Sequence, residues 1–334
     1  MRAAIYGAGS MGTILGAFIT RAGGKIDLIN HDKEHIAALK ENGAHVVGTV
    51  EFTQPVSALL PEEMTGKYDI IFLLTKQQHN HEVVTFLKDY LSEDGVLVTL
   101  QNGLPEDSIA DVIGENRVLG CIVAWGATML GPGVCELTSS PDSLTFSLGR
   151  IGTKPHKYLA NANDYLELMG PVTFKNNFIG MRWSKLLINS AFSGMSTVLG
   201  CTFGETVQNK ESRRLVLDLI NECIHVCETA GIQIEPVQGK DAVKLLGYKN
   251  PLKKAWALFI LPYTIRKHSH LKASMLQDIE NGKTTEVEAL NGAVANFGQK
   301  FDVPTPLNDR VISLIHRIEN GELKPSFDNL KYFK

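Results

Sequence analysis

The chain has 334 residues, of which 44% are apolar and 21% are charged, and its formal net charge is −3. This length favours two domains, because a single hydrophobic core rarely grows beyond roughly 250–300 residues. Lys and Arg are scattered through the chain, which argues against a nucleic-acid or membrane-surface partner. We expect no targeting segment, and the apolar stretch 186–201 is too short to span a bilayer.

Cysteine usage indicates the compartment. The five cysteines are an odd number, and they show neither a CxxC motif nor a Cys/His metal spacing. This pattern favours reduced thiols, a cytoplasmic setting and no bound metal.

The first half of the chain alternates strand-like and helix-like segments. Helices are expected at 11–22 and 32–42, the second with Asp32 as its N-cap. The Gly-Pro-Gly sequence at 131–133 is typical of a turn into another strand. Apolar runs with strand character lie at 3–6, 25–30, 68–76, 95–103 and 116–125. The alternation predicts a parallel sheet wrapped by helices.

The second half of the chain has helical periodicity throughout. The expected helices cover 177–199, 210–230, 239–247, 251–280, 286–299 and 307–319. The predicted fold class is therefore α/β, with a doubly wound sheet at 1–172 followed by an all-helical domain at 173–334.

The sequence GAGSMG at 7–12 matches the G-x-G-x-x-G pattern between an expected strand and an expected helix. Gly7 would permit the tight turn, Gly9 the close approach of a pyrophosphate, and Gly12 the packing of helix on strand. The alternative is a glycine turn with a structural role alone. Its place in a β-α-β unit predicts a Rossmann-type dinucleotide-binding domain.

Phosphates would lie against the start of the first long helix, at Ser10 and Met11, where free N–H groups and the helix dipole favour an anion. Cofactor choice normally depends on the end of the second strand, where an acid binds the NAD ribose and an arginine the NADP phosphate. Asn30 and His31 stand there and satisfy neither rule. The sequence leaves NAD and NADP both open.

Two expected strands end in polar residues, Lys76 and Asn102. Ligands of open α/β sheets bind outside the carboxyl ends of the strands, so both residues are candidate contacts for the cofactor and the substrate. The alternatives are a solvated lysine and an Asn-Gly hairpin turn.

In the helical half, Lys185, Asn189 and Ser193 follow one another at intervals of four residues, and no charged residue lies between 186 and 204. This spacing predicts a polar stripe on a buried helix that lines a wet cavity. A lysine there is suited to donate a proton to a developing alkoxide and to attract an anionic substrate.

A second candidate stretch is SMLQDIENGKTTEVEALNG at 274–292. Thr285 and Glu288 match a T-x-x-E capping box, which would begin a helix with Glu286 in its first turn. The alternative is that Glu286 is an ordinary N-terminal helix acid.

Taken together, these motifs resemble the ketopantoate reductase (2-dehydropantoate 2-reductase) family along nearly the whole chain. The matching features are GAGSMG, LLTKQ at 73–77, QNG at 101–103, WSKLLIN at 183–189 and the 274–292 stretch. The resemblance implies NADPH as cofactor and a crevice lined by Lys76 and Asn102. It also implies Lys185 as the general acid, with Asn189, Ser274 and Glu286 as substrate contacts.

Two positions depart from the family pattern. Ser193 stands where a second asparagine is usual, and His31 stands where NADPH-dependent members carry an arginine. The substrate is therefore either 2-dehydropantoate or another branched or aromatic 2-oxo acid, and the cofactor either NADP(H) or NAD(H).

The expected reaction is hydride transfer to the C2 carbonyl of a 2-oxo acid, with protonation by Lys185. Glu286 would accept from a substrate hydroxyl or orient the lysine. Two rival functions are a β-hydroxyacid dehydrogenase and a dinucleotide-sensing regulator without catalysis. The apolar stretch 255–265 is either a substrate wall or the interface of a possible homodimer.

Overall fold

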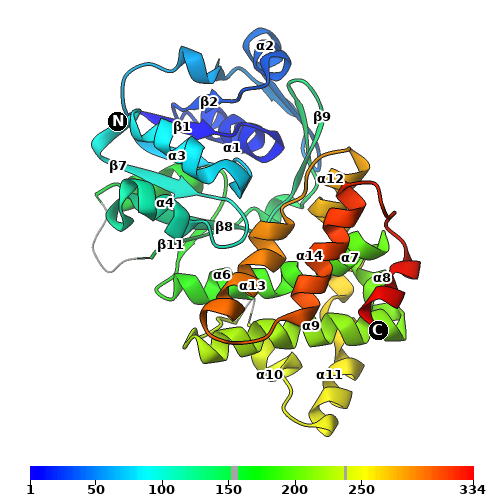
Figure 1. Ribbon diagram of the computed structural model, residues 1–334. Helices are drawn as coiled ribbons and strands as arrows, with labels where there is room; N and C mark the ends of the chain where they lie inside the picture. The colour runs from blue at the N-terminus through cyan, green and yellow to red at the C-terminus, as the bar shows by residue number, and fades with distance from the viewer. Residues whose placement is uncertain (152–156, 237–238) are drawn as a thin grey trace. The chain divides into compact units, whose positions relative to one another are not determined.

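The computed structural model describes residues 1–151, 157–236 and 239–334. The chain forms two compact units, Met1–Phe178 and Ile179–Lys334. The strands all belong to the first unit, and the regular elements described in the second are helices (Figure 1). The predicted α/β architecture with a helical second half is therefore confirmed.

The main sheet of the first unit has eight strands in the order β12-β11-β8-β7-β6-β1-β2-β5. Pairing is parallel from β5 to β8, while β11 is antiparallel to β8. The strands are β1 (Ala3–Tyr6), β2 (Asp27–Ile29), β5 (Ser57–Leu59), β6 (Tyr68–Leu73), β7 (Leu91–Thr99), β8 (Val118–Val123), β11 (Phe146–Arg150) and β12 (Val172–Phe174). The central strands are continuous apolar runs because both faces of a parallel sheet are covered.

Helices cover both faces of this sheet. One hydrophobic cluster packs Ile14 and Leu166 with the sheet, and a second packs Val84 and Ile109 with it. The helices are α1 (Ser10–Arg21), α2 (Lys33–Asn42), α3 (Asn80–Lys88), α4 (Glu106–Ile113) and α5 (Leu159–Glu167). This arrangement is the predicted doubly wound one.

A second, four-stranded sheet was not predicted. Its order is β4-β3-β10-β9, with β3 (Ala44–Gly48), β4 (Phe52–Gln54), β9 (Ala127–Gly131) and β10 (Val134–Leu137). The predicted turn at 131–133 is confirmed as the β9–β10 connection. Helix α1 packs against this sheet.

The second unit is built around the long helix α9, on which α11, α13 and α14 pack (Figure 1). Its helices are α6 (Phe178–Ile188), α7 (Gly194–Leu199), α8 (Phe203–Gln208), α9 (Lys210–Thr229), α10 (Ala242–Leu246), α11 (Pro251–Thr264), α12 (Ser274–Glu280), α13 (Ala293–Lys300) and α14 (Pro306–Glu319). Two π-helices, η5 (Asn189–Ser193) and η7 (Glu288–Gly292), precede α7 and α13 directly.

The predicted single helix at 251–280 is wrong. Helix α11 ends at Thr264, and α12 begins only at Ser274. The backbone between these two helices binds the start of α8, a helix that was not predicted. The N–H groups of Phe203 and Gly204 donate to Leu271 O and Ser269 O. No helix in the described part of the chain is long and apolar enough to cross a membrane.

Candidate functional site

The glycine loop connects β1 to α1, and its backbone is hydrogen-bonded to the end of β2. The N–H groups of Gly7 and Ala8 both donate to Ile29 O, at 3.0 and 2.9 Å. Gly7 has a φ of +96°, and a Cβ there would lie 2.6 Å from Thr75 N. A Cβ on Gly12 would lie 2.6 Å from Gly7 O. The first and third glycines are therefore required by close backbone packing.

Gly9 differs from these two glycines, because a Cβ there would meet nothing within 4 Å. Gly9 is also the N-cap residue of α1, and residues 10–13, all of them described, include no acid. Open space thus lies directly before a helix N-terminus whose first N–H groups have no partner within the helix. The loop fits the pyrophosphate of a dinucleotide.

The strand order reverses beside this loop. β1 lies between β2 and β6, and the registers Tyr6↔Ile29, Tyr6↔Leu73 and Leu73↔Thr99 align the carboxyl ends of four strands. Such a switch point is where open α/β sheets bind their ligands. The predicted polar residues after β2, β6 and β7 therefore share one edge of the sheet.

The end of β2 shows how its polar residues are used. Asn30 Oδ1 accepts from Asp32 N–H at 3.0 Å, and Asp32 Oδ1 accepts from His35 N–H at 3.0 Å. Asp32 is thus the N-cap of α2, as predicted. His31 and Lys33 are both exposed beside it.

Lys76 and Asn102 follow β6 and β7 and are both half-buried. The Asn-Gly sequence leads from β7 into α4, so the hairpin reading of Asn102 is wrong. The Gln77 amide donates to Asn102 O, which joins the two segments.

Gln101 is a positioning residue that the sequence analysis missed. Its Nε2 donates to Thr75 O at 2.8 Å and to Asn80 Oδ1 at 2.7 Å. Its Oε1 accepts from the Thr99 hydroxyl at 3.0 Å. This buried amide ties the end of β7 to the end of β6, and a polar residue directly after a buried strand was the available signal.

His35 is a second missed residue, and it fixes the glycine loop from the side. Its Nδ1 accepts from Gly133 N–H at 3.0 Å, so Nε2 carries the proton toward Thr13 Oγ1 at 3.0 Å. The Thr13 hydroxyl donates in turn to Ala8 O at 3.1 Å. Burial lowers the pKa of His35, and the charge of Asp32 only partly offsets this.

In the second unit, Lys185 lies on α6 between buried neighbours. Ser184 and Leu186 are 2% and 1% exposed, whereas Lys185 is half-buried. The expected burial of the helix around Lys185 is confirmed, and the wet cavity that its polar stripe would line stays a prediction. Asn189 follows one turn later and is also half-buried.

The predicted helix contains a π turn after Asn189. Gly194 N–H donates to Asn189 O and Ala191 O and not to the Ser190 O that an α-helix would use. This π turn changes the angular spacing of the side chains between Asn189 and Ser193, so the α-helical period alone does not give the direction of Ser193. Ser193 is buried, at 5% exposure.

The predicted capping box of Thr285 and Glu288 is also wrong. Thr285 Oγ1 accepts from Val287 N–H at 3.3 Å, but Thr285 N–H donates to Glu319 of α14 at 2.7 Å. Glu286 O accepts from Leu290 N–H, and Glu286 lies before η7, whose N-cap residue is Val287, so Glu286 does not lie in the first turn.

Glu288 instead binds His316. The two imidazole nitrogens lie 2.7 Å from Glu288 Oε1 and 2.8 Å from Glu319 Oε2. Burial lowers the pKa of His316, but hydrogen bonds to Glu288 and Glu319 outweigh it, and the net shift is upward. The start of the Glu286 segment is thus fixed by groups on α14.

Ser274 is the first residue of α12 and is exposed. Both α12 and η7 pack against η5. The helix α12, which begins at Ser274, and η7, which follows Glu286, therefore share a neighbour, the π turn with Asn189 and Ser193.

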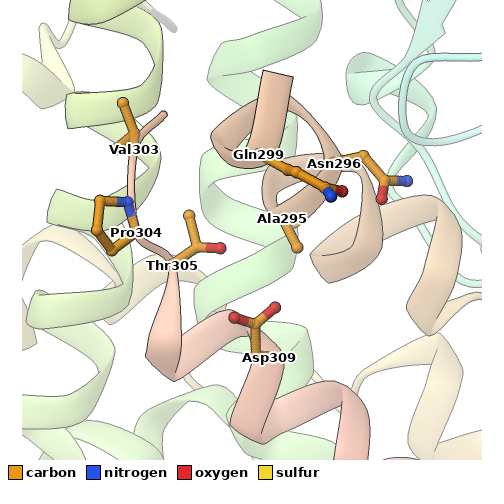
Figure 2. Close-up of a pocket in the computed structure, with 7 residues that line it drawn as sticks. All are labelled: Ala295, Asn296, Gln299, Val303, Pro304, Thr305 and Asp309. Atoms are coloured by element: carbon orange, nitrogen blue, oxygen red, sulfur yellow. The ribbon is translucent and has the colours of Figure 1, made fainter. Parts of the chain in front are cut away.

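A separate pocket of about 340 Å³ lies between α13 and the start of α14 (Figure 2). Its lining is Ala295, Asn296, Gln299, Val303, Pro304, Thr305 and Asp309. It contains none of the predicted site residues and one charged group, Asp309. The candidate site is accordingly defined by the motif residues and not by this pocket.

Comparison with known proteins agrees with these motifs. The model of the ketopantoate reductase PanE/ApbA family matches residues 3–150, and its C-terminal counterpart matches residues 177–319. The chain belongs to the ketopantoate reductase family. It is an oxidoreductase of the 2-dehydropantoate 2-reductase type, and its cofactor is a nicotinamide dinucleotide.

Individual relatives are distant but cover nearly the whole chain. A 2-dehydropantoate 2-reductase from Streptococcus pyogenes serotype M3 is 26% identical over 94% of this chain and 97% of its own. D-mandelate dehydrogenase, solved with NADH and anilino(oxo)acetate, is 25% identical with a TM-score of 0.81, over 96% of this chain and 99% of its own. A dimeric ketopantoate reductase from Staphylococcus aureus is 17% identical with a TM-score of 0.74, over 97% of this chain and 100% of its own, and shows the same fold.

Proposed function

We propose that this protein reduces 2-dehydropantoate to pantoate with NADP(H). The observation that carries the proposal is that three motif segments meet at the carboxyl ends of β1, β6 and β7. Gly7 contacts Thr75, and Gln101 binds Thr75 O, so the glycine loop is joined to the segments that carry Lys76 and Asn102. A dinucleotide on the loop would place its reactive end among polar residues.

The residues of the first unit would bind and orient. The N–H groups of Ser10 and Met11 at the start of α1 would hold the pyrophosphate, with Gly9 leaving room for it. Lys76 would attract the substrate carboxylate, and Asn102 would orient the reacting carbonyl or the nicotinamide. The bound cofactor supplies a hydride to the carbonyl carbon.

The residues of the second unit would complete the reduction. Lys185, protonated at the start, would polarise the carbonyl oxygen and pass it a proton, giving the hydroxyl of the product. Glu286 would accept from a substrate hydroxyl and keep the lysine charged. Asn189, Ser193 and Ser274 would offer hydrogen bonds to the substrate.

The environment of β2 favours NADP(H) over NAD(H). The acid near the end of β2, Asp32, accepts from His35 N–H as the cap of α2, so its carboxylate is engaged in the helix cap and not in binding a ribose hydroxyl. His31 and Lys33 are exposed next to it and could meet a 2′-phosphate. An exposed pair of cation-forming side chains suits a phosphate better than a neutral hydroxyl.

A second candidate is the reduction of another branched or aromatic 2-oxo acid. Ser193 occupies the position where the family usually has an asparagine, so one substrate hydrogen bond would differ. The similarity to D-mandelate dehydrogenase, which was solved with an aromatic oxoacetate, supports the same alternative.

Initial rates distinguish these candidates. NADPH and NADH are each assayed with 2-dehydropantoate, 2-oxoisovalerate and phenylglyoxylate, and NADP⁺ and NAD⁺ are assayed with 3-hydroxy acids in the reverse direction. We expect the highest kcat/KM for 2-dehydropantoate with NADPH. A higher value for phenylglyoxylate with NADH would favour the second candidate, and dinucleotide binding without any turnover would favour a regulator.

We also propose a homodimer through α11. Leu252, Trp256, Phe259 and Tyr263 are all exposed, and they follow one another at intervals of four, three and four residues. Trp256 and Tyr263 each lie about 6 Å from the Phe259 ring, at 6.0 and 5.8 Å. This spacing is the apolar seam of two packed helices, and the same face of a second copy would cover it.

A further inference from the structure

A chain of buried amides in the second unit connects the two π-helices. Asn291 of η7 and Ser190 of η5 are both 0% exposed. Asn291 Nδ2 donates to Ser190 O at 3.0 Å, across 101 positions of sequence. This bond joins the segment that follows Lys185 and Asn189 to the segment that follows Glu286.

The π turn makes Ser190 O available for this bond. In an α-helix Gly194 N–H would donate to Ser190 O, but here it donates to Asn189 O and Ala191 O. The released carbonyl needs a donor, because an unsatisfied buried carbonyl is costly. The Asn291 amide supplies that donor, so the π turn and the asparagine depend on each other.

The Asn291 amide is itself held in one orientation. Its Nδ2 also donates to Asn308 Oδ1 at 2.9 Å. Rotating the amide by half a turn would set its oxygen against two carbonyl oxygens, so only this orientation satisfies both acceptors. A Cβ on Gly194 would lie 3.1 Å from Asn291 Oδ1, which shows how closely the amide approaches the π turn.

A carboxylate on α9 anchors the far end of the chain. Glu222 Oε2 accepts from Asn308 Nδ2 at 2.8 Å and from Asn308 N–H at 3.1 Å. Glu222 Oε1 accepts from Leu307 N–H at 2.8 Å. Glu222 thus fixes the start of α14 and the direction of the Asn308 amide together.

We propose that Asn291, supported by Asn308 and Glu222, is a positioning residue for the reduction. It holds the π turn after Lys185 and Asn189 in a fixed register with the segment after Glu286. None of the three residues needs to touch substrate or cofactor. The inference rests on the proposed roles of Lys185 and Glu286.

The test compares Asn291→Ala with a matched control, Asn329→Ala. Asn329 is also buried in the second unit, and its Nδ2 also donates to two carbonyls, Val198 O and Lys324 O, each at 2.9 Å. It holds the C-terminal segment and not the π turns. Both variants are measured for Tm, NADPH Kd, and kcat and KM for 2-dehydropantoate or the best 2-oxo acid of the panel.

We expect Asn291→Ala to lower kcat about 100-fold, the loss that follows a displacement of about an ångström. NADPH Kd should stay within about twofold. The pH profile of kcat/KM should also change, because the groups around Lys185 move. Asn329→Ala should lower Tm by a similar amount, with kcat within about twofold of wild type and an unchanged pH profile.

Glu222→Gln tests the anchor at a less buried position, where folding is more secure. We expect kcat to fall about tenfold, and the double variant with Asn291→Ala to lose no more than Asn291→Ala alone, since both changes break one chain. Wild-type kcat and pH profile in both single variants would overturn the positioning role alone. Wild-type turnover in Lys185→Ala would overturn the proposed function, and the positioning role with it.

Discussion

At the scale of single residues, the neutral imidazole of His35 links the glycine loop to the β9–β10 turn. Its Nδ1 must stay unprotonated to accept from Gly133 N–H. The unfolded chain, with an ordinary histidine pKa near 6.5, binds a proton that the folded chain rejects. Stability should therefore fall as the pH drops below about 6.5 and down to the lowered pKa of His35.

Urea unfolding at pH 7.5 and pH 5.5 measures this dependence. The loss of unfolding free energy between the two pH values should be smaller in His35→Gln than in wild type. Equal losses in the two proteins would show that another group is responsible.

Alanine substitutions in the glycine loop distinguish glycines needed for packing from the glycine that leaves room for the cofactor. A Cβ on Gly9 meets open space, so Gly9→Ala should leave the unfolding free energy within about 0.5 kcal/mol of wild type. The same methyl group would occupy the approach of the pyrophosphate, so NADPH Kd should rise at least about tenfold. Isothermal titration and urea unfolding measure the two effects.

Gly7→Ala is the matched control. Its φ of +96° and the 2.6 Å approach to Thr75 N predict a loss of about 1–3 kcal/mol in stability. The interpretation of the loop would be wrong if Gly9→Ala were destabilised as much as Gly7→Ala while still binding NADPH normally.

At the scale of elements, two neighbouring residues at the start of α2 have different expected roles: Asp32 caps the helix, and His31 would contact the cofactor. Asp32→Ala removes the acceptor for His35 N–H and should cost about 1 kcal/mol of stability without changing KM for NADPH. His31→Ala should leave stability unchanged and raise KM for NADPH about tenfold, with little effect on NADH. Steady-state rates with both cofactors and urea unfolding measure these outcomes.

The reverse pattern would contradict this assignment. A raised KM for NADH in Asp32→Ala would make Asp32 the ribose-binding acid, and the protein an NAD(H) enzyme.

Local patterns predicted most elements, and long-range contacts explain those they missed. The apolar run 68–76 and the Asp32 cap are local signals, and both correspond to observed features. β3 and β10 each pair with a strand nearby in sequence, β4 and β9, but β3 also pairs with β10 about 90 residues later, and no local pattern shows that the two hairpins join into one sheet. The ends of α11 and α12 depend on α8 in the same way.

The candidate site shows the same division. Spacing drew attention to Lys185 and Asn189, but an α-helical period could not show the π turn between Asn189 and Ser193. Thr285 and Glu288 match a capping pattern, yet Glu319 from α14 supplies the carboxylate. Gln101 and Asn291 act through partners distant in sequence, so periodicity gave no sign of them.

At the scale of the whole molecule, the α11 face predicts self-association. Phe259→Glu places a charge in the middle of the exposed seam and should convert a dimer to a folded monomer, since Phe259 is 60% exposed in the single chain and the charge disturbs no contact of the core. Leu130→Glu is the control, because Leu130 is 58% exposed on β9 in the first unit. Sedimentation velocity measures the state, and a wild-type monomer or a dimeric Phe259→Glu would contradict the α11 interface.

The central claim, reduction of a 2-oxo acid with Lys185 as the proton donor, joins cofactor binding in the first unit to chemistry in the second. Lys185→Met keeps an unbranched apolar stem of similar length and removes the ammonium group. The most direct test of the claim measures, in this variant, the single-turnover oxidation of bound NADPH by saturating 2-dehydropantoate, with NADPH Kd measured separately. We predict a wild-type Kd and a rate lowered by about 10²–10⁴-fold, the usual contribution of a general acid. A rate near that of wild type would contradict the account.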